Sequence, residues 1–372
     1  MGRVDGGLNR HCYADSVLGI DVRVARAAWT VFLLALLIAT AYAIRVTLVV
    51  FMLALLFAYM LAPLVNLVQK HLPRHVPPAV ALAIVYLLFL GALVSLGFLL
   101  GSRMIDEATN LGNKLPEFFK NPEWMKKIPL PAWLDPWRAR IIGTIQAEFS
   151  SGGKDLMPYA QKAILSVASG LNGVLFVVLV PILALFFLKD GSEMRDKFIQ
   201  GLGDEPQRAL ATDILNDIHV LLGQYIRALV LLAMATFISY SAFLMLTGAP
   251  YALLLAGTAA LLEFIPVVGP LAAGTILLLV CGFSEYPHLL WLFLFWILYR
   301  LFQDYVLSPQ LMSAGVELHP LLVLFGVLAG EQIAGIPGMF FSVPVIATLR
   351  VIYVRAQRAR QRSQFAIPKV AL

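Results

Sequence analysis

Residues 261–270 read LLEFIPVVGP, and they place one acid, two prolines and a glycine inside a long apolar run. The 35 residues Ala228–Leu262 before Glu263 carry no charged side chain, and neither do the 21 residues Phe264–Ser284 after it. A carboxylate at membrane depth is energetically expensive, and proline breaks a helix because it removes a backbone N–H donor. The stretch therefore indicates a helix interrupted inside a membrane, beside an acid that needs partners or water.

The rest of the chain repeats this membrane-length pattern. Of the 372 residues, 60% are hydrophobic and only 13% are charged, about half the charged share of a typical soluble domain. Further charge-free runs of 18, 24, 27 and 26 residues lie at Ala27–Ile44, Val46–Gln69, Val76–Ser102 and Ala163–Leu188. Roughly 20 apolar residues carry a helix across the hydrocarbon core. The sequence predicts an all-α membrane protein, a polytopic bundle of about eight hydrophobic segments, two of them broken by proline and glycine.

Charge and motif content exclude several classes of function. The net charge is +6, but basic residues concentrate in the tail 350–372, directly after an apolar run. Positive charge is expected at such a place on the cytoplasmic side of a membrane. We therefore expect no nucleic-acid partner. Cys12 and Cys281 are too far apart for a CxxC motif, and the six histidines show no metal-ligand spacing. Nucleophile-elbow, zinc-protease and phosphate-loop motifs are missing from the sequence. We expect no enzyme, catalytic residue, metal or cofactor, and the lipid bilayer as a partner.

Loop charges give a topology with both termini in the cytoplasm, because arginines precede the first apolar run and follow the last one. Gly97 and Gly101, four residues apart, allow close helix approach, and together with an apolar stripe in 190–227 they indicate a homo-oligomer. The expected organisation is a cytoplasmic N-terminus at 1–26, spans one to three at 27–102, an external interfacial insert at 103–162, span four at 163–189, a cytoplasmic amphipathic helix at 190–227, a repeat-like transport core at 228–349 and a basic cytoplasmic tail at 350–372.

The last third of the chain contains a weak internal repeat. A helix at 228–246 is followed by an apolar block that holds Glu263 and then IPVVGP, and a helix at 289–307 is followed by a block that holds Glu331 and then IAGIPG. Thirty helical residues reach about 45 Å, too far for one upright crossing. Each block is therefore either a kinked span or a re-entrant helix–turn–helix hairpin. Paired interrupted segments are the best sequence pointer to the binding site of a transporter.

Polar residues near these breaks are the candidate binding groups. Glu263 and Glu331 are predicted to bind a coupling ion or a solute, since a buried carboxyl group can exchange a proton for a cation. Arg300 and Asp304 lie four residues apart on one helix face and can pair, or Arg300 can neutralise Glu263 or Glu331 across the bundle. The remaining predicted substrate- or ion-binding residues are Gln303 and Gln332. Structural hydrogen bonds within the bundle are the alternative role for all of them.

Helix-breaking residues follow both acids. They are expected to expose backbone carbonyl and amide groups to a solute and to act as gates, or else to serve only as hinges and close packing points. These residues are Pro266, Gly269, Pro270, Gly335, Pro337 and Gly338.

Three longer motifs resemble the autoinducer-2 exporter family of bacterial permeases. They are LLEFIPVVGP at 261–270, RLFQDYVLSPQLMSAGVELHPLLVLFGVLAG at 300–330 and IPGMFFSVPVIATLRV at 336–351, and FFLKDG at 186–191 resembles the family segment after its fourth span. The resemblance implies a multi-pass inner-membrane permease that exports small molecules such as autoinducer-2, with some members linked to sodium–proton exchange.

Three functions therefore stay open. The first is gradient-driven export of a small polar solute by alternating access, with coupling to H⁺ or Na⁺. The second is a sodium– or lithium–proton antiporter. The third is a membrane scaffold or regulator without flux, in which the external insert and the amphipathic stripe at 204–225 are docking surfaces.

Overall fold

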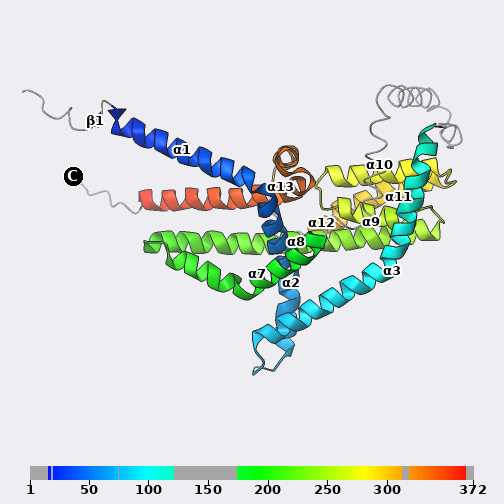
Figure 1. Cartoon of the computed structure of the whole chain (residues 1–372), viewed down its shortest axis with the longest axis horizontal. Helices are drawn as coiled ribbons and strands as arrows, with labels where there is room; N and C mark the ends of the chain where they lie inside the picture. The colour runs from blue at the N-terminus through cyan, green and yellow to red at the C-terminus, as the bar shows by residue number, and fades with distance from the viewer. Residues whose placement is uncertain (1–15, 18–19, 74, 121–173, 312–317, 366–372) are drawn as a thin grey trace, which may run out of the picture. The chain divides into compact units, whose positions relative to one another are not determined.

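A computed structural model describes residues 16–17, 20–73, 75–120, 174–311 and 318–365 of the chain (Figure 1). Nearly all of these residues are helical, apart from a two-residue antiparallel pair of strands, β1 (Ser16–Val17) and β2 (Ile20–Asp21). Residues 121–162 of the predicted external insert, and 163–173 at the start of predicted span four, lie outside the described residues. The predicted all-α class is confirmed.

Six of the described helices are long and apolar enough to cross a membrane, and they carry the predicted polytopic bundle. The helices are α1 (Val22–Ala43), α2 (Arg45–His71), α3 (Pro78–Lys120), α7 (Val174–Gln200), α8 (Glu205–Leu246), α9 (Ala252–Leu262), α10 (Val268–Phe283), α11 (Leu289–Phe302), the π-helix η2 (Gln303–Leu307), α12 (Ser308–Leu311) and α13 (Pro320–Phe365). Met1–Val49 and Val50–Leu372 form two compact units. Everything described below lies in the second unit.

Large apolar side chains cover much of the outside of these helices. Phe98 in α3 is 80% exposed and Leu246 in α8 is 87% exposed. A water-soluble monomer rarely exposes contiguous apolar surface of this extent, whereas a lipid-facing helix requires it.

Several helices run past the membrane-length segments that the sequence defines. α3 continues from the third predicted span to Lys120, and α8 joins the predicted amphipathic helix and the next span into one helix. α8 begins after Asp204, with Pro206 in its first turn, where a missing N–H is tolerated. A membrane surface ends the apolar composition of a segment but does not itself interrupt the helical hydrogen bonds.

The largest core lies where α8, α9, α10 and α11 pack together with the end of α3. Figure 1 shows α9, α10 and α11 grouped beside the C-terminal half of α8. Phe243 of α8 stacks on Phe295 of α11 with 4.1 Å between ring centroids, and Thr236, further back in α8, contacts Tyr299, further on in α11. Because later residues of α8 pair with earlier residues of α11, the two helices run antiparallel to each other.

The first broken block is a hairpin. α9 and α10 are separated by a turn at residues 263–267, and the chain beyond α10 returns to the start of the hairpin, where the Tyr286 hydroxyl donates to the Thr247 carbonyl at 3.4 Å. Gly269 is required for this turn, because a Cβ atom there would lie 1.8 Å from the Leu262 carbonyl oxygen. Val267 in the turn has a φ of 65°, an unusual backbone conformation for a β-branched residue.

The second broken block also folds back on itself. α13 is broken at Ala334 and Gly335, where Gly335 has a φ of 64° and a ψ of −143°. The two arms meet through glycines: a Cβ atom on Gly330 would lie 2.2 Å from the Gly338 carbonyl oxygen, and one on Gly326 would lie 3.3 Å from Ser342 Cβ. Both interrupted blocks are therefore helix–turn–helix hairpins, which decides between the two forms that the sequence allows.

Charged contacts fix the second arm of α13 to the N-terminal half of α8. Arg355 Nε donates to Asp217 Oδ2 at 2.6 Å, and Arg355 Nη1 donates to Asp213 Oδ2 at 3.0 Å. Since Asp213 and Asp217 are one helical turn apart, they present their carboxylates on the same face of α8.

Glu107 of α3 closes the N-terminal end of α9. Its Oε2 atom accepts a hydrogen bond from the backbone N–H of Leu254 at 2.8 Å, and that N–H lies in the first helical turn, where no intrahelical acceptor exists. The negative charge also lies at the positive end of the helix dipole. The sequence does not predict this contact, because 147 positions separate the two residues.

We expect Glu107→Leu to lower the free energy of unfolding by about 1.5–3 kcal/mol, the range for a hydrogen bond to a charged group. Thermal unfolding of the purified protein in detergent measures the change. Asp106→Leu is the matched control, because Asp106 is the exposed neighbour in the same helix. Equal destabilisation by both substitutions would contradict a specific role for Glu107.

Candidate functional site

Glu263 lies in the turn of the first hairpin, directly after α9, and its side chain is only 8% exposed. Its backbone N–H is bonded to the Ala259 carbonyl at 3.1 Å, so the turn fixes the direction of the side chain. The carboxylate is thereby held between the hairpin, α8 and α11. Buried carboxylates need both charge compensation and hydrogen-bond donors.

Two neutral side chains donate hydrogen bonds to Glu263. Gln303, 2% exposed and the first residue of η2, donates from Nε2 to Glu263 Oε1. Thr236 of α8 donates from Oγ1 to Glu263 Oε2 at 3.4 Å, and the same hydroxyl is 3.0 Å from the Tyr299 hydroxyl. One carboxylate thus joins three elements that are distant in sequence.

Arg300 supplies positive charge to the same carboxylate. Its Nη1 atom lies 3.6 Å from Glu263 Oε1, and its Nη2 atom lies 2.6 Å from Asp304 Oδ1. The structure realises both pairings that the sequence allows for Arg300 with nearby acids, one within the helix and one across the bundle. Two carboxyl groups therefore share one guanidinium.

The helix changes its winding where it meets Glu263. α11 passes at Gln303 into the five-residue π-helix η2, which then leads into α12. π-turns are rare and frequently mark functional sites, because the wider turn displaces side chains from the regular helical face. Gln303 and Asp304 both belong to this turn, and the sequence offers no signal for it.

Thr236 and Tyr299 are members of the cluster that the sequence analysis missed. Both lie in apolar helices where a hydroxyl group is easily taken for packing. Tyr240, one turn after Thr236, stacks edge-on against Tyr299 with 5.2 Å between ring centroids. A weak signal was present, since Thr236 and Tyr240 place two hydroxyl groups four residues apart on one face of α8.

Glu331 occupies a different environment. It is exposed and accepts a hydrogen bond from its neighbour Gln332 at 2.8 Å, so among the described residues it does not join the Glu263 cluster, and ion or solute binding by Glu331 stays a prediction. The reason lies in the hairpin, whose interior is filled by Gly330 against Gly338. The next residue along the helix, Glu331, is rotated by about 100° and leaves that interior.

The two hairpins nevertheless touch. Phe264, next to Glu263, packs edge-on against Phe340 of the second hairpin, with 5.6 Å between ring centroids. The turn that carries Glu263 is therefore in aromatic contact with the second hairpin, although Glu331 does not take part.

The predicted helix breakers lie at the turns of the two hairpins. Pro270 is in the first turn of α10, where a helix has no use for its N–H group, and Pro266 belongs to the connecting turn. Gly335 forms the break in α13, and Pro337 and Gly338 begin its second arm. Their geometry is that of helix termination, while gating by these residues stays a prediction.

Comparison with known sequences identifies the family of this chain. A profile of the family described as AI-2E family transporter matches residues 31–358 of the chain. The chain belongs to the AI-2E transporter family. It is a multi-pass membrane transporter, and the resemblance seen in its motifs is confirmed.

Individual AI-2E relatives are distant but cover most of the chain. A Bacillus subtilis (strain 168) protein named "Putative transport protein YueF" is 26% identical over 82% of this chain and 84% of its own length. A second one from the same organism, "Putative transport protein YrrI", is 23% identical over 81% and 84%. The Escherichia coli (strain K12) protein "Putative permease PerM" is 26% identical over 73% and 77%.

Proposed function

We propose that the chain is an inner-membrane permease that exports a small polar solute, of the autoinducer-2 type, with Glu263 as the coupling carboxylate. Both termini lie in the cytoplasm in this proposal, and the protein assembles as a homo-oligomer. Gradient-driven alternating access moves the solute past the first hairpin, and H⁺ or Na⁺ is the coupling ion.

The observation that carries this proposal is the buried carboxylate of Glu263 in a hairpin turn. Burial disfavours an isolated charge, and the cluster supplies one shared guanidinium and two neutral donors. Such a group accepts a proton or a cation in one state and releases it when water reaches the turn. The hairpin tip is the part of the element that changes its surroundings most when the hairpin moves.

The arrangement of the repeats supports alternating access. α8 and α11 run antiparallel, and each is followed by a hairpin, so the two copies are related as an inverted pair. Inverted repeats with broken helices exchange their conformations across the membrane midplane in many secondary transporters. This relation supports a mechanism that opens alternately to the two sides.

The test is solute counterflow in proteoliposomes with autoinducer-2 as the probe. Glu263→Gln is expected to reduce flux by more than about tenfold, because the amide cannot bind and release a proton. Glu331→Gln is the matched control, since this exposed acid lies outside the cluster, and it should retain most of the flux. Wild-type flux in Glu263→Gln would remove this carboxylate from the mechanism.

A sodium– or lithium–proton antiporter is the second candidate. The pairing of two carboxyl groups with a single guanidinium favours it, because a cation and a proton can then compete for one carboxylate. A sodium pulse on vesicles with an imposed proton gradient should then collapse the gradient in the wild type and leave it in Glu263→Gln. Normal behaviour of every carboxylate variant, combined with failure on deletion of 103–162, would instead indicate the scaffold function.

A further inference from the structure

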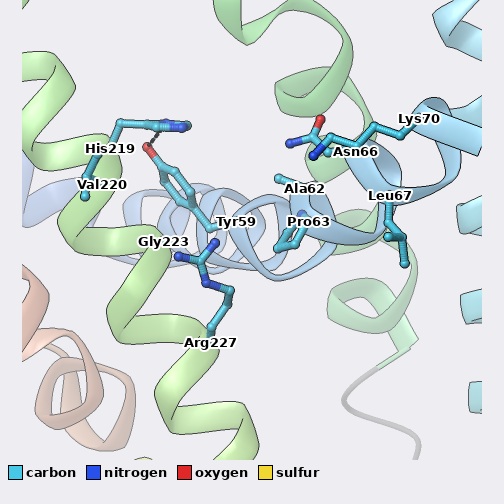
Figure 2. Close-up of a pocket in the computed structure, with 10 residues that line it drawn as sticks. All are labelled: Tyr59, Ala62, Pro63, Asn66, Leu67, Lys70, His219, Val220, Gly223 and Arg227. Carbon is cyan, nitrogen blue, oxygen red and sulfur yellow. Dashed lines mark hydrogen bonds between the residues drawn. The ribbon is translucent and has the colours of Figure 1, made fainter. Parts of the chain in front are cut away.

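A pocket of about 400 Å³ lies between α2 and α8, away from the Glu263 cluster (Figure 2). The C-terminal half of α2 contributes Tyr59, Asn66 and Lys70, and α8 contributes His219 and Arg227. Its polar lining residues comprise two cations, an imidazole, an amide and a phenol, and none of the residues that line it is acidic. This chemistry selects an anion.

Tyr59 of α2 packs against α8 at one side of the pocket. Tyr59 lies against α8 at Gly223, where a Cβ atom would already be 3.8 Å from the tyrosine ring, and the Tyr59 hydroxyl is 3.2 Å from His219 Nδ1. Pro63, one turn after Tyr59, has no backbone N–H and so removes one helical hydrogen bond of α2. Figure 2 shows Lys70 extending back toward Asn66 while Arg227 and His219 approach from α8.

Each of the two cations flanks one end of a charge-free run. The charge-free run of α2 ends immediately before Lys70, and the charge-free run of α8 begins immediately after Arg227. Basic residues at such boundaries lie at the level of the lipid headgroups. The rim of the pocket also carries Leu67 and Val220, which are 55% and 54% exposed and suited to contact acyl chains.

We propose that this pocket binds the phosphate headgroup of an anionic phospholipid. Arg227 can form paired hydrogen bonds to phosphate oxygens, Lys70 supplies a point charge, and the Asn66 amide can add a neutral donor. An anionic headgroup with attached acyl chains satisfies the basic lining and the apolar rim together, whereas free inorganic phosphate satisfies only the lining. Basic pockets between membrane helices are suited to such headgroups.

α8 links this pocket to the Glu263 cluster. α8 carries Arg227 and, further along the same helix, Thr236, which donates to Glu263. A headgroup bridging Lys70 and Arg227 therefore holds α8 against α2.

The experiment is native mass spectrometry of the full-length protein in detergent, with added phosphatidylglycerol or phosphatidylcholine. The wild type should retain phosphatidylglycerol preferentially, and Lys70→Gln and Arg227→Gln should each weaken its binding by about fivefold. Arg358→Gln removes an exposed cation outside the pocket and should bind as the wild type does. Equal retention by the wild type and by the variant with both pocket substitutions would overturn the proposal.

Two further arms separate the source of the anion and guard against misfolding. Inorganic phosphate should displace little phosphatidylglycerol; if phosphate binds with the same dependence on Lys70 and Arg227 while the lipid is not retained, the lipid assignment is wrong. Arg227→Lys keeps the charge but loses the paired hydrogen bonds, so its lipid binding should lie between that of the wild type and that of Arg227→Gln. Loss in this variant equal to that in Arg227→Gln would also contradict a charge-based headgroup site.

Discussion

Arg300→Gln is expected to lower the free energy of unfolding in detergent by about 2–3 kcal/mol, which corresponds to several degrees in Tm. The substitution leaves the buried Glu263 carboxylate without its cationic partner, and an unpaired buried charge is more unfavourable than a buried amide. Introducing Glu263→Gln into the same chain removes that charge and should restore most of the lost stability. Thermal unfolding of the two single variants and the double variant measures the coupling.

Asp304→Asn serves as the comparison in this cycle. Asp304 is more exposed than Glu263, and its loss leaves Arg300 paired with Glu263, so only a small change is expected. Additive effects of Arg300→Gln and Glu263→Gln, with no recovery in the double variant, would show that the two side chains are not coupled.

Gly338→Ala is expected to prevent closure of the second hairpin. The new methyl group would lie 1.9 Å from the Gly330 carbonyl oxygen, and backbone atoms on both sides leave no flexible side chain to move away. Ordinary overpacking costs about 1–3 kcal/mol, and a clash with backbone should exceed that range. The measurable result is loss of folded protein in size-exclusion chromatography and a lower Tm in any folded fraction.

Gly91→Ala is the matched control for this substitution. Gly91 lies in α3, and a Cβ atom there would meet no atom of the described chain within 4 Å. Because alanine favours helix over glycine by about 1 kcal/mol, this variant should be as stable as the wild type or slightly more stable. A normal hairpin in Gly338→Ala, shown by an unchanged Tm, would contradict the close glycine contact.

Much of the fold follows from composition, because lipid requires helices with apolar segments of a definite length and leaves few alternatives. The breaks after Glu263 and Glu331 were also predictable, since proline and glycine act locally on the backbone. The choice between kinked spans and hairpins was not, because it depends on how Gly330 meets Gly338 across the turn. The local sequence does not predict such a contact.

The candidate site was only partly predictable for the same reason. Arg300 and Asp304 are four residues apart, so their pairing follows from helical spacing. Thr236 reaches Glu263 only through tertiary packing, and an apolar helix gives its hydroxyl no distinguishing mark. The two acids occupy similar positions in the repeat, yet Glu331 is turned outward, so the repeat is structural and does not extend to the environment of its acids.

The attachment of Arg355 to Asp213 and Asp217 has a mechanical consequence. α8, which carries both aspartates, also contacts the first hairpin through Thr236, which lies about 30 Å from Asp217 along the helix axis. A stiff rod that is fastened to both hairpins transmits the tilt of one end to the other. In the proposed transport cycle, displacement of either hairpin is therefore expected to shift the other one while both attachments hold.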